Sequence, residues 1–326
     1  MNDVQVLTQN VRRITAPNPG PMTGAGTNTY ILGRDRFVVV DPGPAIDSHI
    51  EAILKQVDGR LEAILVTHTH SDHSPAAAKL AARTLAPRYG LVSSNIALQD
   101  ATFTPDVLLK HNELLKFSDC NLRAIHTPGH VDNHFCFMVE GGVAEDNGML
   151  LAGDHIMNGS TVVIMPPQGD MAQYIESLRR LATYPLSVIA PAHGDLMPEP
   201  LKVLDHLIAH RLGREQKVLD SLATSEQASE RINIKDLVQI VYSDVDSRLY
   251  PIACYSLLAH LLKLESEQKV RRFELPHNNS PRDNQSIAQQ DYWQLCLQPS
   301  ALRPMPLPPL LSTRHTTDAR SARQAS

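Results

Sequence analysis

The chain has 326 residues, of which 20% are charged, and a formal net charge of -5 at pH 7. A mildly acidic chain has no overall positive field for nucleic acid or an anionic membrane, and this length allows one large domain and a smaller one. The four cysteines form no Cys-x-x-Cys pair, which argues against a zinc finger or a disulfide framework. The chain lacks a secretory signal and any run of ~20 apolar residues, so we expect a soluble cytoplasmic protein.

The first 200 residues alternate short β-branched runs with amphipathic stretches. The expected strands are 28–32, 37–40, 61–66, 122–125, 134–139, 149–152 and 187–189. Apolar residues at helical spacing predict helices over 47–57, 75–85 and 171–184. Sheets interleaved with helices in this way predict an α/β layered domain over residues 1–200.

Five of these strands are followed by aspartate or histidine. The residues are Asp41, His68, the pair His126 and His130, Asp154, and His193. Packing of a core does not require polar donors at strand ends, whereas a site shared at one sheet edge does. We therefore expect the residues that follow these five strands to lie close together.

The character of the sequence changes near residue 200. Long amphipathic helices are predicted over 201–222, 234–242 and 252–266, and 267–273 is predicted as a short hairpin or wing. This order is typical of a small winged-helix-like domain, which we place at 201–275. Asn, Ser, Gln and Pro dominate afterwards, so we expect a disordered tail over 276–326.

The densest group of donors is His68-x-His70-x-Asp72-His73. Residues two apart on an extended segment point the same way, so His68 and His70 can hold one metal ion as neutral imidazoles. Asp72 and His73 follow on the turn, where a second ion can lie a few ångströms away. Solvated loop histidines are the alternative, and the further donors at later strand exits weigh against it.

This segment resembles the H-x-H-x-D-H signature of the metallo-β-lactamase superfamily. The later motifs of that family are matched by His130 in Thr-Pro-Gly-His, Asp154 in Gly-Asp-His and His193 in Pro-Ala-His-Gly, so the resemblance covers about 200 residues. It implies an αββα sandwich with two metal ions. The implied ligands are His68, His70 and His130 for the first ion, Asp72, His73 and His193 for the second, and Asp154 between them.

Nitrogen-rich donors with carboxylates and no thiolate suit zinc, with manganese or iron as alternatives, and we expect two Zn²⁺ per chain. Two such ions hold a bridging hydroxide at neutral pH that can attack an acyl or phosphoryl centre, and Asp72 is expected to orient it. Asp41 and His134 are expected to hydrogen-bond ligands from behind. The alternatives are an Asp-Pro-Gly turn for Asp41 and a bond to a backbone carbonyl for His134.

Within the superfamily, the chain resembles the lactamase-β-2-like group through the 67–75 motif, the charged helix at 210–219 and the segment 257–265. That group includes thioesterases and a single-strand RNA endonuclease, so a small ester or thioester and single-stranded nucleic acid are both candidate substrates. Residues 201–275 contain eleven Lys or Arg and eleven Asp or Glu, which argues against phosphate binding.

The sequence thus predicts a zinc-dependent hydrolase that cleaves an ester, thioester or phosphodiester bond, and three alternatives remain at this point. A basic stripe for RNA can still form from Arg211, Arg214, Lys217, Lys269, Arg271 and Arg272. A mononuclear iron dioxygenase can use the same fold with three ligands. A regulator that binds DNA through the winged-helix-like end is disfavoured by the complete donor set.

Overall fold

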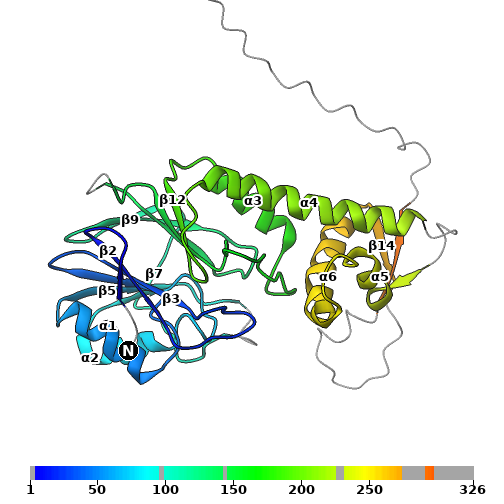
Figure 1. Cartoon of the computed structure of the whole chain (residues 1–326). Coiled ribbons are helices and arrows are strands. Elements are labelled where there is room, and N and C mark those ends of the chain that lie inside the picture. Colours follow the sequence, from blue (N-terminus) through cyan, green and yellow to red (C-terminus); the bar gives the residue numbers. More distant parts are fainter. Residues whose placement is uncertain (1–3, 95–98, 142–144, 225–230, 274–290, 297–326) are drawn as a thin grey trace, which may run out of the picture. The chain divides into compact units, whose positions relative to one another are not determined.

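The larger part of the described chain is built around two β-sheets (Figure 1). The computed structural model describes residues 4–94, 99–141, 145–224, 231–273 and 291–296. The first sheet runs in sequence order: β1 (Val4–Val6), β2 (Val11–Thr15), β3 (Asn28–Leu32), β4 (Phe37–Val40), β5 (Leu61–Leu65), β6 (Arg88–Gly90) and β7 (Val107–Leu108). The strands β4 and β5 are parallel, and Val40 pairs with Leu65. Both strands therefore end at the same edge of the sheet.

The second sheet has the order β12-β11-β10-β9-β8. Its strands are β8 (Glu113–Lys116), β9 (Asn121–His126), β10 (Phe135–Val139), β11 (Met149–Gly153) and β12 (Val188–Pro191). The strands β11 and β12 are parallel, and Leu151 pairs with Ala190. The residues that follow these two strands are consequently neighbours.

The two sheets pack face to face between layers of helices. Val38 and Val40 of the first sheet share a core with Phe137 of the second. The outer face of the first sheet packs against α1 (Asp47–Val57) and α2 (Ala76–Thr84), and that of the second against α3 (Met171–Leu181) and the first part of α4 (Pro200–Thr224). Strands covered on both faces are apolar throughout, as in Phe37–Val40. The expected αββα sandwich is confirmed.

A second core lies in the C-terminal helical part. It joins the end of α4 to α5 (Ile234–Val241) and α6 (Tyr250–Ser266), which follows the 3-10 turn η2 (Ser247–Leu249). Asn233 begins α5 by accepting bonds from the backbone N–H groups of Lys235 and Asp236, which an N-cap side chain supplies to otherwise unpaired donors. These helices pack against a small sheet of β13 (Ile232–Asn233), β15 (Tyr292–Leu295) and β14 (Val270–Phe273). The winged-helix-like organisation predicted for this part is confirmed.

Helix α4 contributes side chains to the core of the αββα sandwich and to the core of the helical part. Leu204 and Leu207 pack on the second sheet, whereas Val218 and Leu222 pack on α5 and α6. The helix begins at Pro200, the position near which we expected the boundary between the two parts (Figure 1). No described helix is both long and apolar enough to cross a membrane.

Two expectations for the C-terminal part need correction. Residues 267–273 hold one strand, β14, and its partner is β15 and not a strand within that segment. The predicted tail over 276–326 is wrong for 291–296, because β15 carries Trp293, whose side chain is completely buried. Burial of this large aromatic ring is the physical reason that the strand is ordered. The rest of the predicted tail, 276–290 and 297–326, lies outside the described residues.

Candidate metal centre

Seven donor side chains come together where the strands of both sheets end. They are His68, His70, Asp72 and His73 after β5, His130 between β9 and β10, Asp154 after β11, and His193 after β12. They form two groups, and within each group the donor atoms lie within 4.8 Å of one another. We call His68, His70, His130 and Asp154 the first donor group, and Asp72, His73 and His193 the second.

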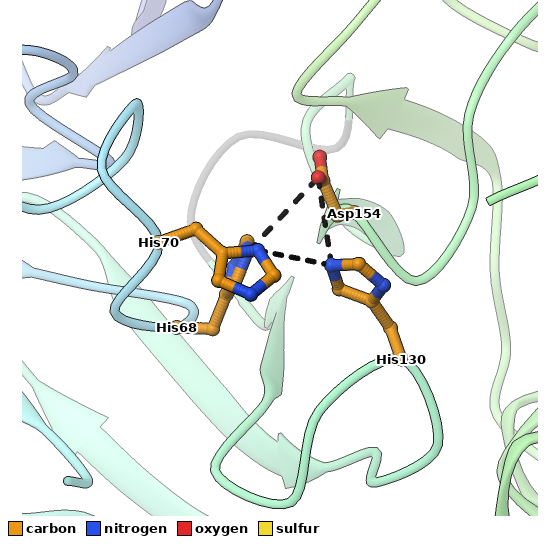
Figure 2. Close-up of side chains that lie close together, drawn as sticks. All are labelled: His68, His70, His130 and Asp154. Atoms are coloured by element: carbon orange, nitrogen blue, oxygen red, sulfur yellow. Dashed lines mark hydrogen bonds and ion pairs between the residues drawn. The ribbon is translucent and has the colours of Figure 1, made fainter. Parts of the chain in front are cut away.

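In the first donor group the side chains point toward one another (Figure 2). His68 Nε2 lies 2.9 Å from His70 Nδ1, which lies 3.2 Å from His130 Nε2. Nitrogens bound tetrahedrally to one zinc ion at 2.0–2.1 Å stand about 3.3 Å apart. The observed spacing is close to that value.

The second donor group is built around a carboxylate. Asp72 Oδ2 lies 3.4 Å from His73 Nε2 and 3.3 Å from His193 Nε2. The side chains of both histidines are almost completely buried, whereas that of Asp72 is 24% exposed. Asp72 is thus the member of this group that faces solvent.

Asp154 presents one oxygen to each group. Its Oδ2 lies 4.0 Å from His68 Nε2 and 3.8 Å from His130 Nε2, while Oδ1 lies 3.3 Å from His73 Nε2 and 3.1 Å from His193 Nε2. The turn that places it requires Gly153, whose φ is 52° and where a Cβ would lie 2.6 Å from His134 Nε2. The carboxylate therefore stands between the two groups.

The ring nitrogens that face away from the centre are held by hydrogen bonds. His130 Nδ1 donates to the Val163 carbonyl at 2.8 Å, and His193 Nδ1 donates to the Gly26 carbonyl at 3.2 Å. A carbonyl oxygen only accepts, so in the neutral form of both rings Nε2 keeps its lone pair directed into the centre. Backbone groups thus set the tautomers of these two histidines.

A carboxylate and a hydroxyl do the same for two further rings. Asp41 Oδ2 accepts from His73 Nδ1 at 2.9 Å and from the Thr67 hydroxyl at 2.7 Å. Because Thr67 directs its proton to Asp41, its oxygen accepts from His68 Nδ1 at 3.0 Å. In the neutral rings the Nε2 atoms of His68 and His73 are left as acceptors that face the donor groups.

The expected roles of Asp41 and His134 have a geometric basis. Asp41 adopts a φ of 49° and also accepts from the Thr67 backbone N–H, so one side chain orients the start of the His68 segment. His134 accepts from the backbone N–H of Asp154 at 3.2 Å, and its Nδ1 lies 2.8 Å from the Thr127 hydroxyl. Our sequence interpretation included Thr67 in the motif and gave it no role. It missed the carbonyls of Gly26 and Val163, for which a sequence carries no signal.

The two donor groups differ in their electrostatics. Burial lowers the pKa of His70 to about 3, with His130 adding to the effect, and burial also lowers the pKa of His68 and His130. In the second group burial acts in the same direction, but nearby carboxylates outweigh it. Asp154 and Asp72 raise the pKa of His193 to about 9, and Asp72, Asp154 and Asp41 raise the pKa of His73.

The donor set fits divalent metal ions. His73 Nε2 and Asp154 Oδ1 are completely buried, and neither makes a hydrogen bond of normal geometry with a described residue. The ion pairs of Asp154 Oδ1, at 3.1 and 3.3 Å, are contacts between donors that point at a common centre. Buried polar atoms without partners are costly, and a metal ion satisfies them. Five imidazoles and two carboxylates without a thiolate suit zinc.

Comparisons with known proteins agree with this geometry. The family model for the metallo-β-lactamase superfamily matches residues 22–193, and the model for the β-lactamase associated winged helix domain matches 234–275. The β-lactamase-like protein 2 homolog of Drosophila melanogaster is 32% identical over 281 residues, which cover 81% of this chain and 91% of that protein. An atrochrysone carboxyl ACP thioesterase of Aspergillus chevalieri is 31% identical, covering 84% of this chain and 86% of the relative.

Solved structures share the fold. A β-lactamase domain protein from Burkholderia ambifaria aligns with a TM-score of 0.71 at 20% identity, covering 90% of this chain and 94% of that one. A metallo-β-lactamase family protein from Thermus thermophilus aligns with a TM-score of 0.67 at 19% identity, covering 89% of this chain and all of the other. The chain therefore belongs to the metallo-β-lactamase superfamily of hydrolases and carries the winged helix domain associated with it.

Proposed function

We propose that this protein is a zinc-dependent thioesterase, a hydrolase that cleaves an acyl thioester or a related ester at a two-metal centre. The observation that carries the proposal is Asp154, which turns Oδ2 toward the first donor group and Oδ1 toward the second. A carboxylate placed in this way would serve as a ligand shared by a two-metal centre. The similarity to the Aspergillus thioesterase supports the substrate class.

The proposed ligands are His68, His70 and His130 for one zinc ion and Asp72, His73 and His193 for the other, with Asp154 shared. Bound there, two zinc ions supply Lewis acidity for the acyl oxygen and a hydroxide nucleophile at neutral pH. The outer partners of four of these histidines hold Nε2 as an acceptor directed at the centre. The chain thus provides both the donors and their orientation.

Asp72 has a second role in the proposal, as the group that orients the attacking water. Its side chain is the more exposed of the two carboxylates, 24% against 11% for Asp154. Burial acts to raise the pKa of Asp72, but His73 and His193 hold it well below its usual range, so the carboxylate stays ionised. The buried Thr27 hydroxyl donates to Oδ2 at 3.2 Å and fixes the carboxylate plane.

The bond changes are those of thioester hydrolysis. The water oxygen bonds to the acyl carbon while Asp72 accepts a hydrogen bond from the water. The carbon–sulfur bond then breaks, one proton of the water stays with the acid, and the other passes by way of Asp72 to the leaving thiolate. An acid and a thiol are the products.

A nuclease is disfavoured because the basic residues that we considered for a phosphate-binding stripe are engaged elsewhere. Arg211 and Arg214 are buried. The ion-pair partners are Asp244 for Arg214 and Lys217, Glu267 for Lys269, and Asp291 for Arg272. Arg271 is exposed, and one cation gives little of the counterion release on which phosphate binding depends.

The winged helix domain also lacks a free reading helix. In helix-turn-helix proteins the second helix of the motif enters the major groove of DNA. The corresponding helix here, α6, places Ala259 in the core that contains Met171 of α3. That face of α6 is occupied by the αββα domain, which supports a structural role for the winged helix domain.

Metal analysis combined with a substrate panel tests the proposal. The purified full chain is assayed on acyl thioesters, lactones, phosphodiesters and short single-stranded RNA, before and after chelation and zinc repletion. We expect two zinc ions per chain, hydrolysis of a thioester, loss on chelation and recovery with zinc. Turnover by the metal-free protein would overturn the scheme, and cleavage of RNA alone would favour the nuclease. One iron per chain without hydrolysis would favour a dioxygenase.

A further inference from the structure

Helix α4 contains two buried arginines one turn apart, Arg211 and Arg214, which are 3% and 7% exposed. Each guanidinium lies over a tyrosine ring and donates to a backbone carbonyl. The partners of Arg211 are Tyr174, with Cζ 5.1 Å from the ring centroid, and the Val162 carbonyl at 2.5 Å. The partners of Arg214 are Tyr242, at 4.3 Å, and the Val241 carbonyl.

The two arginines differ in what they hold. Arg214 acts within the helical part, where Asp244 also pairs with it. Arg211 reaches across to the αββα domain, and no carboxylate of the described residues lies within ion-pair distance of it. Burying a guanidinium without a carboxylate costs free energy, so its place needs another explanation.

The carbonyl that accepts from Arg211 adjoins the one that orients a proposed zinc ligand. Val162 accepts from Arg211, and the next residue, Val163, accepts from His130 Nδ1 at 2.8 Å. Residues 161–165 form neither helix nor strand, so no regular ladder fixes these carbonyls. The bond from Arg211 therefore restrains the segment that orients His130.

Tyr174 supports His130 through the residue that precedes it. The preceding Gly129, with φ of 144°, packs so closely on α3 that a Cβ there would lie 2.3 Å from Tyr174 Cα. The Gly129 carbonyl also accepts from the Asp170 backbone N–H at 2.8 Å, next to the start of α3. Arg211 thus contacts both supports of His130, the 162–163 segment and the Tyr174 ring.

We propose that Arg211 is a positioning residue that couples helix α4 to the metal centre by fixing the imidazole of His130. This inference rests on the proposed metal centre. It explains why a winged helix domain without a free reading helix is joined to the αββα domain through one continuous helix. Weakening the Arg211 contact selectively impairs the ion held by the first donor group.

The test compares Arg211→Met with Arg214→Met in the full chain, because both replacements keep an unbranched apolar side chain and remove the guanidinium. Zinc affinity is measured by competition with a chromophoric chelator, and the cobalt-loaded proteins are compared by visible absorption. We expect Arg211→Met to lose about 10- to 100-fold in affinity for one of two ions and to change the cobalt spectrum, as loss of an outer hydrogen bond does. Arg214→Met should lower the melting temperature and keep both ions.

Arg211→Lys gives a milder variant that retains the charge and one donor, for use where the methionine variant does not fold. It should recover part of the lost affinity. Wild-type affinity and an unchanged cobalt spectrum in the Arg211 variants would overturn the proposal, and so would an equal loss in Arg214→Met.

A measurement on metal-free protein separates this inference from the proposed function. With ¹⁵N-labelled histidine, the His130 Nδ1–H should give a slowly exchanging signal in wild type and in Arg214→Met, and a broadened or absent one in Arg211→Met. A wild-type protein that binds no metal would refute the proposed centre. Equal signals in all three proteins would refute the role of Arg211 whatever the metal result.

Discussion

The two donor groups hold the same kind of side chain in opposite states. Burial keeps the pKa of His70 at about 3, whereas for the buried His193 the carboxylates of Asp154 and Asp72 outweigh burial and raise the pKa to about 9. Behind the first group stand a hydroxyl and a backbone carbonyl, and behind His73 stands the carboxylate of Asp41. The number of nearby carboxylates, and not the depth of burial, decides whether a histidine of the metal-free protein carries a proton.

Removing the carboxylate shared by both groups should have the largest effect. Asp154→Ala leaves each group one donor short, so we expect loss of both ions and a fall in turnover of at least about 10³-fold, equivalent to several kcal/mol. Metal analysis and thioester kinetics check this. The matched control is Asp146→Asn, a buried carboxylate bonded to Asn10 away from the donor set, which should keep both ions. Retention of both ions by Asp154→Ala would show that the groups do not share a ligand.

Asp72→Ala separates metal binding from orientation of water. The variant keeps two imidazoles and Asp154 for the second ion, so zinc at high concentration should restore the metal content. Turnover should stay about 10²- to 10⁴-fold below wild type, the usual contribution of a positioned acid or base. Metal content and kcat are measured on the same sample. Near-normal turnover in the metal-replete variant would end the proposed role of Asp72.

Asp41→Ala tests an outer partner that contacts the second group directly, through His73, and the first group only by way of Thr67. It removes the acceptor of the bonds from His73 and Thr67, so the ion of the second group should bind about 10- to 100-fold more weakly. The ion of the first group should be affected less, because Asp41 reaches His68 only through the Thr67 hydroxyl. Stepwise zinc removal by a chelator resolves the two affinities. An equal loss at both ions would mean that Asp41 supports the whole segment, and the groups would not be independent.

Much of this arrangement follows from the sequence because strand ends are easy to locate. The apolar runs before Asp41, Thr67, Gly153 and Ala190 identify strands. In the structure β4 is parallel to β5 and β11 is parallel to β12, so the residues that follow the strands of each pair lie at one edge of the sheet. All seven donors named from the motifs lie in the two groups. Their individual roles as ligands remain a prediction.

The features that the sequence did not indicate are contacts of backbone atoms and several strands. The carbonyls of Gly26 and Val163 orient two rings, and any residue provides a carbonyl. The strands β1, β6 and β7 have two or three residues each, too few for an alternation to be recognised. The longer strands β2 and β8 were missed as well, because charged residues leave only short apolar runs in them. β15 was missed because its partner β14 is separated from it by a polar segment, and only tertiary packing of Trp293 decides its place.

The smallest expected effect is on the pH dependence of stability, and it addresses the difference between the groups directly. The pKa of His70 falls to about 3 from 6.5, so the metal-free fold loses stability as pH falls from 6.5 toward 3. The pKa of His193 rises to about 9, so its contribution is full below pH 6.5 and is lost as pH rises through 9. Replacing His70 with Gln should therefore flatten the acid limb of the stability profile, and replacing His193 with Gln the alkaline limb.

Urea unfolding of the metal-free proteins across pH 4–9.5 measures both limbs. Each variant serves as the control of the other, because both lose one imidazole from the same centre. The urea midpoint is the quantity to compare. A change in the dependence of the unfolding free energy on urea concentration would indicate a change in compactness instead. If both variants flatten the same limb, the carboxylates do not give the histidines of the two donor groups opposite pKa shifts. Opposite limbs would establish that this one cluster holds neutral and protonated histidines side by side before any metal binds.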